Sequence, residues 1–170
     1  MITGPIAAGK NTVASALADR VSSFGRTAVV ADVDDVAAMV TGRGAASSGL
    51  WFAAHRAHGV LVAEWLRSAV NVVIAVGPIY SMDEQAAFLD PLPAGQVVHW
   101  VVVDAPVAVT FARAIADPTR GLSRDRAFHT ERHQRFRDLL PGIPADQTFN
   151  SDGRSADSIA AAILAAIDVG

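Results

Sequence analysis

The segment Gly4–Thr12, with the sequence GPIAAGKNT, constrains the fold of this chain more than any other feature. It contains Lys10, the only lysine among the 170 residues, while every other permanent positive charge is an arginine. The spacing G-x-x-x-x-G-K predicts a phosphate-binding loop, in which backbone N–H groups surround a phosphate and the lysine adds a compact charge. Such a loop needs a strand before it and a helix after it, and Met1–Thr3 and the segment from Lys10 provide both. We therefore expect the chain to bind a nucleoside triphosphate.

The whole loop is expected to contact the nucleotide. The predicted nucleotide-binding residues in it are Gly4, Pro5, Ile6, Ala7, Ala8, Gly9, Lys10, Asn11 and Thr12. The residue after the lysine is normally Ser or Thr, whose hydroxyl binds Mg²⁺, but here it is Asn11. Either Asn11 holds magnesium through its amide oxygen, or Thr12 is recruited, or magnesium is held more weakly. ATP is expected rather than GTP, because the guanine-specifying Asn/Thr-Lys-x-Asp motif would need a second lysine.

Apolar strand-like runs alternate with helical patterns along the chain, without repeats or a composition break. The expected strands are Met1–Thr3, Thr27–Ala31, Asn71–Val76, Val97–Val103 and Gln147–Phe149. The expected helices are Lys10–Ser22, a short one ending at Met39, Leu50–Arg67, Ser81–Leu89, Pro106–Ala116, Phe128–Leu139 and Ser155–Ile167, with a loop at Thr41–Gly49. This alternation predicts an α/β fold in three layers, with a central parallel sheet of about five strands and helices on both faces. Residues 1–170 are expected to form a single domain.

An acidic corner, Asp32, Asp34 and Asp35, follows the second expected strand. Ligands of open parallel sheets bind at the carboxyl ends of the strands, so a carboxylate here would face the terminal phosphate. We expect Asp34 to accept a proton from a substrate hydroxyl or to help hold magnesium. Asp32 is the lesser candidate, and at least one of the three is expected to cap the next helix. Asp104 is a second possible acid, but the following Ala-Pro favours a helix N-cap there.

The segment Asp117–Arg126 combines proline, glycine and arginines, which predicts a mobile lid that closes over a ligand. Arg120 and Arg124 are expected to neutralise charge on a transferring phosphoryl group. Three further arginines on the next helix, Arg132, Arg135 and Arg137, are expected on the solvated surface.

Bulk properties exclude several classes of protein. The absence of cysteine excludes disulfides and cysteine-bound zinc, and the net charge of −3 argues against a nucleic-acid partner. The longest apolar run, Val97–Val103, is far shorter than the roughly 18–20 residues that span a bilayer. We therefore expect a cytoplasmic protein without a membrane partner. His55 and His58 lie three apart on a long helix, where core or groove packing is favoured over metal binding.

The motifs together resemble those of small P-loop kinases. The resemblance is carried by the loop Gly4–Thr12, the strand and acid Val29–Asp34, the Asp117–Arg126 segment and the ending Asp146–Ser151, and it spans most of the chain. The nearest relatives are chloramphenicol phosphotransferase-like and zeta-toxin-like kinases, with shikimate and gluconate kinases further off. Only the loop is highly specific; Asn11 and a third strand without an acid depart from the pattern.

The resemblance implies the three-layer P-loop fold of nucleoside and shikimate kinases. It also implies that the carboxylate after the second strand, here Asp34, deprotonates the acceptor hydroxyl. Lid arginines contact ATP phosphates, which corresponds to Arg120 and Arg124, and Arg113 is placed on the nucleotide side.

We therefore expect an ATP-dependent kinase that transfers the γ-phosphate to a hydroxyl of a small molecule, with nucleosides and nucleotides among the possible acceptors. The expected catalytic residues are Lys10, Asp34, Arg120 and Arg124, and the expected magnesium ligands are Asn11, Thr12 and Asp34. Two alternatives stay open: a nucleotide-binding regulatory protein with little catalysis, and a nucleotide hydrolase. A monomer or a homodimer is expected.

Overall fold

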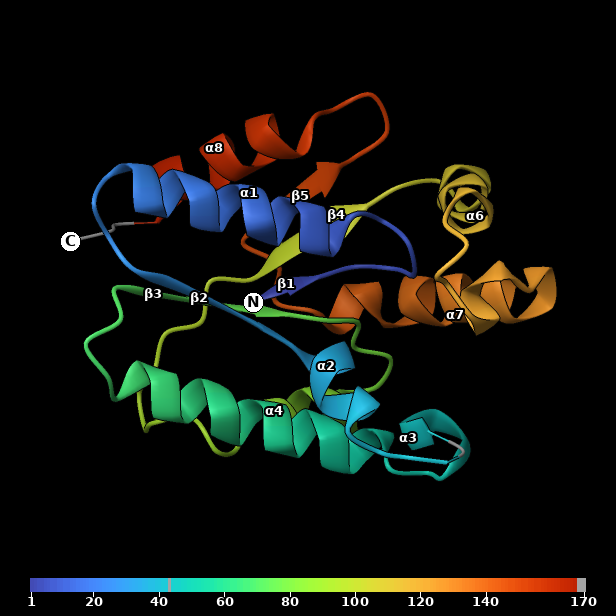
Figure 1. The fold of residues 1–170 in the computed structure, drawn as a ribbon, viewed down its shortest axis with the longest axis horizontal. Coiled ribbons are helices and arrows are strands. Elements are labelled where there is room, and N and C mark those ends of the chain that lie inside the picture. The colour runs from blue at the N-terminus through green and yellow to red at the C-terminus, as the bar shows by residue number, and fades with distance from the viewer. Residues whose placement is uncertain (43, 168–170) are drawn as a thin grey trace.

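The computed structural model describes residues 1–42 and 44–167, and a parallel sheet between two helical layers dominates it (Figure 1). Within these residues the sheet has five strands in the order β2-β3-β1-β4-β5. The strands are β1 (Ile2–Thr3), β2 (Ala28–Asp32), β3 (Val72–Val76), β4 (Val101–Asp104) and β5 (Gln147–Asn150). The predicted α/β fold class with a five-stranded parallel sheet is therefore confirmed.

Helices cover both faces of this sheet. They are α1 (Lys10–Ser23), α2 (Val33–Ala38), α3 (Gly44–Ser47), α4 (Trp51–Leu66), α5 (Met82–Leu89), α6 (Val107–Ala116), α7 (Arg126–Leu139) and α8 (Ala156–Ala166), with the 3-10 turns η1 (Leu122–Arg124) and η2 (Leu140–Gly142). Figure 1 shows α1 and α8 on one side of the sheet and α4 on the other. No helix in the described part of the chain is long and apolar enough to cross a membrane.

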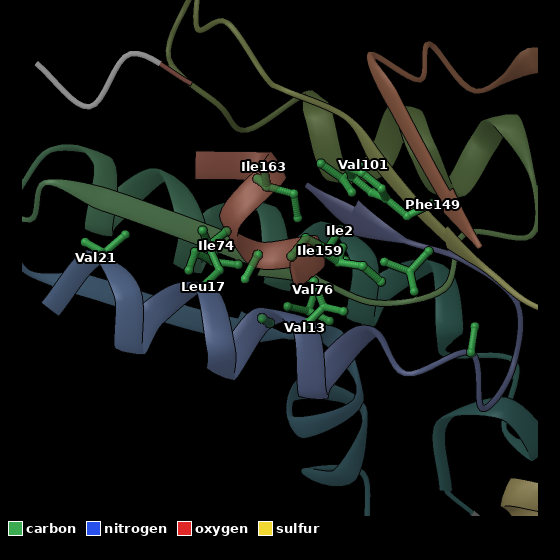
Figure 2. Packing of buried hydrophobic residues seen from close by; sticks show 14 residues of the cluster. Ile2, Val13, Leu17, Val21, Ile74, Val76, Val101, Phe149, Ile159 and Ile163 are labelled. Atoms are coloured by element: carbon green, nitrogen blue, oxygen red, sulfur yellow. The ribbon is translucent and has the colours of Figure 1, made fainter. Parts of the chain in front are cut away.

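The alternation of side chains along β4 divides the core between these layers. Val101 and Val103 belong to the cluster under α1 and α8, whereas Val102 belongs to the cluster on the other face. The first cluster is completed at helical spacing by Val13, Leu17 and Val21 of α1 and by Ile159 and Ile163 of α8 (Figure 2). This packing fixes the start of α1, and therefore the loop before it, against the end of the sheet.

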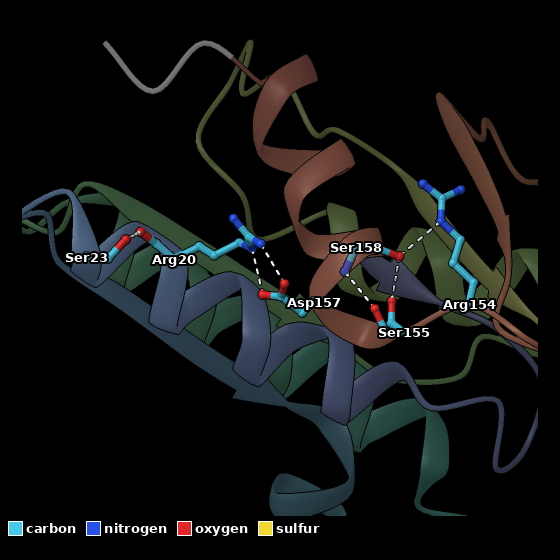
Figure 3. A network of polar contacts seen from close by, with 6 residues as sticks. All are labelled: Arg20, Ser23, Arg154, Ser155, Asp157 and Ser158. Atoms are coloured by element: carbon cyan, nitrogen blue, oxygen red, sulfur yellow. Dashed lines mark hydrogen bonds and ion pairs between the residues drawn. The ribbon is translucent and has the colours of Figure 1, made fainter.

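A polar contact also joins α1 to α8 at the surface (Figure 3). Arg20 donates from Nε and Nη2 to the Asp157 carboxylate, at 2.9 and 2.6 Å. Ser155 caps α8 by accepting a hydrogen bond from the Ser158 N–H at 3.2 Å. Because the ion pair is largely exposed, it adds about 0–1 kcal/mol, and the apolar cluster carries most of the packing.

The two histidines of α4 are core residues, as the sequence predicted. Both rings are fully buried, and His58 Nε2 donates to the Ala31 carbonyl at 2.9 Å. Burial lowers the pKa of His55 to about 4, so this ring is neutral at physiological pH.

Two element predictions need correction. The strand expected over Val97–Val103 begins only at Val101, because its neighbour β1 begins at Ile2 and pairs with Val101. The loop expected over Thr41–Gly49 contains the short helix α3; position 43 of that loop lies outside the described residues.

Asp104 does not cap α6, contrary to the prediction. The helix begins at Val107, and Pro106 occupies the N-cap position without a side-chain hydrogen bond. The Asp104 carboxylate instead accepts hydrogen bonds from the Ala105 N–H at 2.8 Å and from Arg137 Nη1. The guanidinium of α7 is a stronger partner for a carboxylate than a neutral N–H, and it draws Asp104 away from the helix start.

Candidate active site

The loop between β1 and α1 has the geometry of an anion-binding turn. Its backbone passes through left-handed conformations at Ala7 (φ 55°) and Gly9 (φ 94°). At Gly4 the loop crosses β4 so closely that an added Cβ would lie 1.9 Å from the Val103 carbonyl oxygen. Glycine is therefore required at the start of the loop for steric reasons, and the left-handed residues give the loop the curvature of a turn that binds anions.

Lys10 is the first residue of α1 and is almost completely buried, with 7% of its surface exposed. Its Nζ donates to the Pro5 carbonyl at 2.9 Å and to the Gly4 carbonyl at 3.2 Å, inside the curve of the loop. Burial lowers the pKa of Lys10 to about 8, against the opposing effect of Asp34 and Asp32. The ammonium is thus only partly stabilised by the protein and is suited to an added anion.

Asp32 and Asp34 of the acidic corner have different contacts. Asp32 caps α2, because its Oδ1 accepts the Asp34 N–H at 2.9 Å, and its Oδ2 accepts Asn11 Nδ2 at 2.6 Å. The second bond uses the nitrogen of the Asn11 amide as a donor, which leaves the amide oxygen as the atom that could bind a metal. Asp34 instead faces the cavity next to the loop. Loss of hydration there, together with Asp32, raises the pKa of Asp34 above its usual value.

The larger cavity beside the loop, of about 450 Å³, brings Lys10 and Asp34 together. One wall is the phosphate-binding loop, and the others come from α2, α4, the segment after β3, η1 and α7. Its lining includes Ile6, Ala7, Gly9, Lys10, Asn11, Thr12, Asp34, Trp51, Pro78, Tyr80, Glu84, Arg120, Ser123, Phe128, Arg132 and Arg135. Aromatic and charged side chains thus share a concave site of the size that small ligands use.

A smaller cavity of about 330 Å³ lies along the same loop and is bordered by the segment after β5. Arg113 reaches across it, donating from Nη1 to Ser151 Oγ at 2.9 Å and from Nη2 to the Ser151 carbonyl at 2.8 Å. The Ser151 hydroxyl donates to the Ala8 carbonyl at 2.7 Å, which ties this segment to the loop. Arg120 lines both cavities and therefore stands at their junction.

A protein-family model described as "AAA domain" matches residues 1–141, most of the chain. The chain belongs to this AAA domain family. No curated protein matches the sequence.

Solved structures of kinases share the fold. An APS kinase from Mycobacterium tuberculosis, in complex with AMPPNP and APS, is 20% identical with a TM-score of 0.67, covering 96% of this chain and 93% of that one. A shikimate kinase from Acinetobacter baumannii, in complex with shikimate, is 22% identical with a TM-score of 0.60, covering 96% and 88%. A tunicamycin resistance protein from Deinococcus radiodurans is 19% identical with a TM-score of 0.62, covering 99% and 94%. The resemblance of this family member to small-molecule P-loop kinases is therefore confirmed at the level of fold.

Among the predicted site residues, the two lid arginines have different positions. Arg120 is held by Asp117, with Nε 3.1 Å from Oδ2, and points to the junction of the two cavities. Arg124 ends the turn η1, is exposed, and lines neither cavity in this structure. Its expected contact with phosphate therefore stays a prediction that requires the lid to move.

Two of the arginines of α7, Arg132 and Arg137, are only partly exposed and correct the expectation of a solvated surface, whereas Arg135 is exposed as expected. Arg132 and Arg135 line the larger cavity, and Arg137 pairs with Asp104 at the end of β4. The reason is that α7 buries His129, His133 and Phe136 against the rest of the molecule, which turns neighbouring positions toward the cavity. That burial pattern, at helical spacing, was the available sequence signal.

Sequence reasoning also missed Tyr80 and Glu84 as cavity residues. Ser81 caps α5 by accepting the Glu84 N–H at 3.1 Å. The Glu84 carboxylate, however, accepts the Tyr80 N–H at 2.7 Å and reaches the cavity wall. Burial raises the pKa of both side chains. No sequence motif marks this pair as cavity residues, because their place there depends on contacts with the distant Arg132 and Arg135.

Proposed function

We propose that this chain is an ATP-dependent phosphotransferase that moves the γ-phosphate to a hydroxyl of a small molecule. The observation that supports this most directly is a single cavity lined by both the loop lysine, Lys10, and the Asp34 carboxylate. Phosphoryl transfer needs a cation on the phosphates and a base or orienting group on the attacking oxygen, a few ångströms apart. The family match and the kinase fold support the same class of reaction.

In this proposal the nucleotide spans the two cavities. The loop N–H groups and Lys10 bind its phosphates, and the base and ribose lie toward Arg113 and the smaller cavity. Arg120 stands where the transferring phosphoryl group would lie, and Arg124 joins it when the lid over 117–126 closes. The acceptor then occupies the larger cavity beside Asp34.

The reaction step is balanced with these groups. The acceptor oxygen forms a bond to the γ-phosphorus as the bond from that phosphorus to the β-phosphate oxygen breaks, and ADP leaves. The hydroxyl proton passes to Asp34, whose raised pKa brings it closer to neutrality as a base. Burial of the partners in the cavity excludes water, which would otherwise compete as acceptor.

The oxygen donors near the loop fit magnesium. The described residues contain no group of three or more His, Cys, Asp or Glu side chains arranged to hold a metal. Mg²⁺ usually takes only one or two protein ligands together with substrate phosphates and water, so Asn11 Oδ1, Thr12 Oγ1 and the Asp34 carboxylate suffice as candidates. When bound, the ion would neutralise charge on the β- and γ-phosphates.

One observation favours a second candidate function, a nucleotide-binding regulatory protein with little catalysis. Asn11 replaces the usual Ser or Thr and commits its amide nitrogen to Asp32. If its oxygen is a poor magnesium ligand, nucleotide would bind without efficient transfer.

The experiment that separates these functions measures ATP consumption with Mg²⁺ across pooled hydroxyl-bearing metabolites, antibiotics and nucleotides. Wild type is compared with Lys10→Ala, Asp34→Asn and the control Asp19→Asn, an exposed change on α1. Phosphotransfer predicts a pool that triggers turnover, lost in Lys10→Ala and reduced about 100-fold or more in Asp34→Asn with ATP affinity retained. Turnover without any acceptor would indicate a hydrolase. Lys10-dependent ATP binding without turnover in any pool would favour the regulatory function.

A further inference from the structure

Arg132 lies in the wall of the larger cavity without a polar partner. Its Nε is buried and makes no hydrogen bond, and the side chain forms no ion pair with any described residue. Its Cζ lies 5.2 Å from the Phe128 ring centroid and 5.7 Å from that of Tyr80. Aromatic faces attract a cation but accept no strong hydrogen bond from its N–H groups. The guanidinium is therefore held in place, and its terminal Nη groups, which make no hydrogen bond with the described residues, are the donors that a ligand in the cavity can meet.

Arg135 adds a second positive charge on the same side of α7, three residues further on. Its Nε donates to the Tyr80 carbonyl at 3.2 Å, and it lines the same cavity. Glu84, whose carboxylate lines the same cavity, forms no ion pair within 4 Å with either arginine in the described structure. Its Oε2 is occupied by the Tyr80 N–H at 2.7 Å and lies 3.6 Å from His55 Nε2. Neither arginine is therefore in a close ion pair in the described structure, although both lower the pKa of Glu84 against the effect of its burial.

The position of Arg132 separates it from the nucleotide side. Arg113, Arg120 and Arg154 line the smaller cavity, whereas Arg132 and Arg135 line only the larger one. The phosphates already have Lys10 and Arg120 near the loop. Arg132 is therefore placed to meet the other ligand of the larger cavity.

We propose that the phosphoryl acceptor is an alcohol that also carries an oxyanion, and that Arg132, with Arg135 beside it, binds that oxyanion. This inference rests on the proposed function. A guanidinium fork matches the paired oxygens of a carboxylate, phosphate or sulfate, and two cavity-lining guanidinium groups without a close ion pair favour a ligand that supplies such oxygens. Trp51, Tyr80 and Phe128 complete the walls, which favours an acceptor with an apolar or ring-shaped body.

The first test compares matched acceptors with the wild-type protein. Ring-bearing hydroxycarboxylic acids are assayed beside their methyl esters, and hydroxyl compounds with a phosphate or sulfate ester form two further arms. We expect kcat/KM for ATP consumption to be at least about 10- to 100-fold higher with an anionic compound than with its neutral partner. The arm with the highest value identifies the oxyanion. Equal use of acid and ester would overturn the inference.

The second test changes the arginine. Arg132→Gln is expected to raise KM for the anionic acceptor about 10- to 100-fold while the Kd for ATP stays unchanged. Arg132→Lys keeps the charge but loses the fork, and it serves as the conservative variant. Arg67→Gln, an exposed change at the far end of α4, is the matched control. An unchanged KM in Arg132→Gln, or a weakened ATP affinity instead, would assign Arg132 to packing or to the nucleotide and contradict the proposal.

A binding measurement separates this inference from the proposed function. The melting temperature of the wild type is recorded with a non-hydrolysable ATP analogue and each acid or ester. Stabilisation by the acids but not the esters, lost in Arg132→Gln, supports anion recognition even if no compound is phosphorylated; the phosphotransferase proposal then fails alone. If the acids give neither stabilisation nor turnover, the anion site is refuted.

Discussion

Lys10 is placed to bind an anion, and its burial lowers the stability of the folded protein without a ligand. Its pKa is lowered from 10.5 to about 8 by burial, so the folded protein at pH 7 holds an ammonium in an unfavourable environment. We predict that Lys10→Met, which keeps the length of the side chain, stabilises the nucleotide-free protein at pH 7 by about 1–3 kcal/mol. The gain in stability is limited because the variant also loses the two hydrogen bonds from Lys10 Nζ to the loop carbonyls.

The sign of the pH dependence follows from the lowered pKa. Below about pH 8 both the folded and unfolded states keep the proton, and the cost of burial is complete. Between pH 8 and 10.5 the Lys10 side chain is protonated only in the unfolded state, so the free energy of unfolding of the wild type rises with pH. The difference between Lys10→Met and wild type, measured by urea unfolding, should therefore be largest at pH 7 and shrink toward pH 10. A difference that is constant with pH, or a less stable variant at pH 7, would show that the loop hydrogen bonds outweigh burial.

At the scale of elements, α7 is fixed to the sheet by polar contacts as well as by packing. Arg137 pairs with Asp104 at the end of β4, and His133 Nε2 donates to the Ala105 carbonyl at 3.0 Å. We predict that Arg137→Ala lowers the free energy of unfolding by about 1–2 kcal/mol, because the partly buried carboxylate loses its charged donor. Arg67→Ala, which removes the exposed Arg67–Glu64 pair, should cost less than about 0.5 kcal/mol. Equal urea midpoints for the two variants would contradict an anchoring role for Arg137.

The lid segment has its own anchor in His129. Its Nδ1 donates to the Ser123 carbonyl at 2.9 Å, so Nε2 accepts from the Thr110 hydroxyl at 2.9 Å, and burial lowers the pKa of the ring. We predict that His129→Leu releases η1 and speeds trypsin cleavage after Arg120 or Arg124 several-fold. Cleavage after Arg67, on α4, provides the internal control. Identical cleavage rates after Arg120 in variant and wild type would mean that this histidine does not restrain the lid.

The elements that the sequence predicted well are those determined by local signals. The loop Gly4–Thr12 requires particular residues at fixed positions, and the alternation of strands with helices needs only short-range periodicity. The strand before Val101 was over-extended because an apolar run does not reveal where its neighbours begin. An apolar segment forms a ladder only opposite another strand.

The walls of the larger cavity could not be predicted in the same way. Arg132 looks like a solvated charge in a polar helix, and only the packing of α7 brings it, beside the exposed Arg135, to the cavity that Asp34 also lines. Tyr80 is linked to that helix through Arg135, which donates to its carbonyl, and through Arg132, which lies near its ring, and Glu84 joins it by accepting the Tyr80 N–H. Such placements depend on tertiary contacts between distant segments, which one sequence does not encode as a pattern.

For the whole molecule, cooperativity depends on a central strand of only two residues. Ile2 pairs with Val76 on one side and with Val101 on the other, and it lies in the cluster beneath α1 and α8. It therefore links the β2-β3 half of the sheet to the β4-β5 half. We predict that Ile2→Ala lowers the free energy of unfolding by about 2–4 kcal/mol through the buried cavity it leaves.

Because both halves share the same apolar clusters, unfolding of the variant should still be a single transition. Tryptophan fluorescence, to which the buried Trp100 beside β4 contributes, and far-UV circular dichroism should give the same urea midpoint. Val97→Ala is the control, since that side chain is 85% exposed and its loss should change stability by less than about 0.5 kcal/mol. Two separated midpoints in Ile2→Ala would show that the two halves of the sheet unfold as independent units.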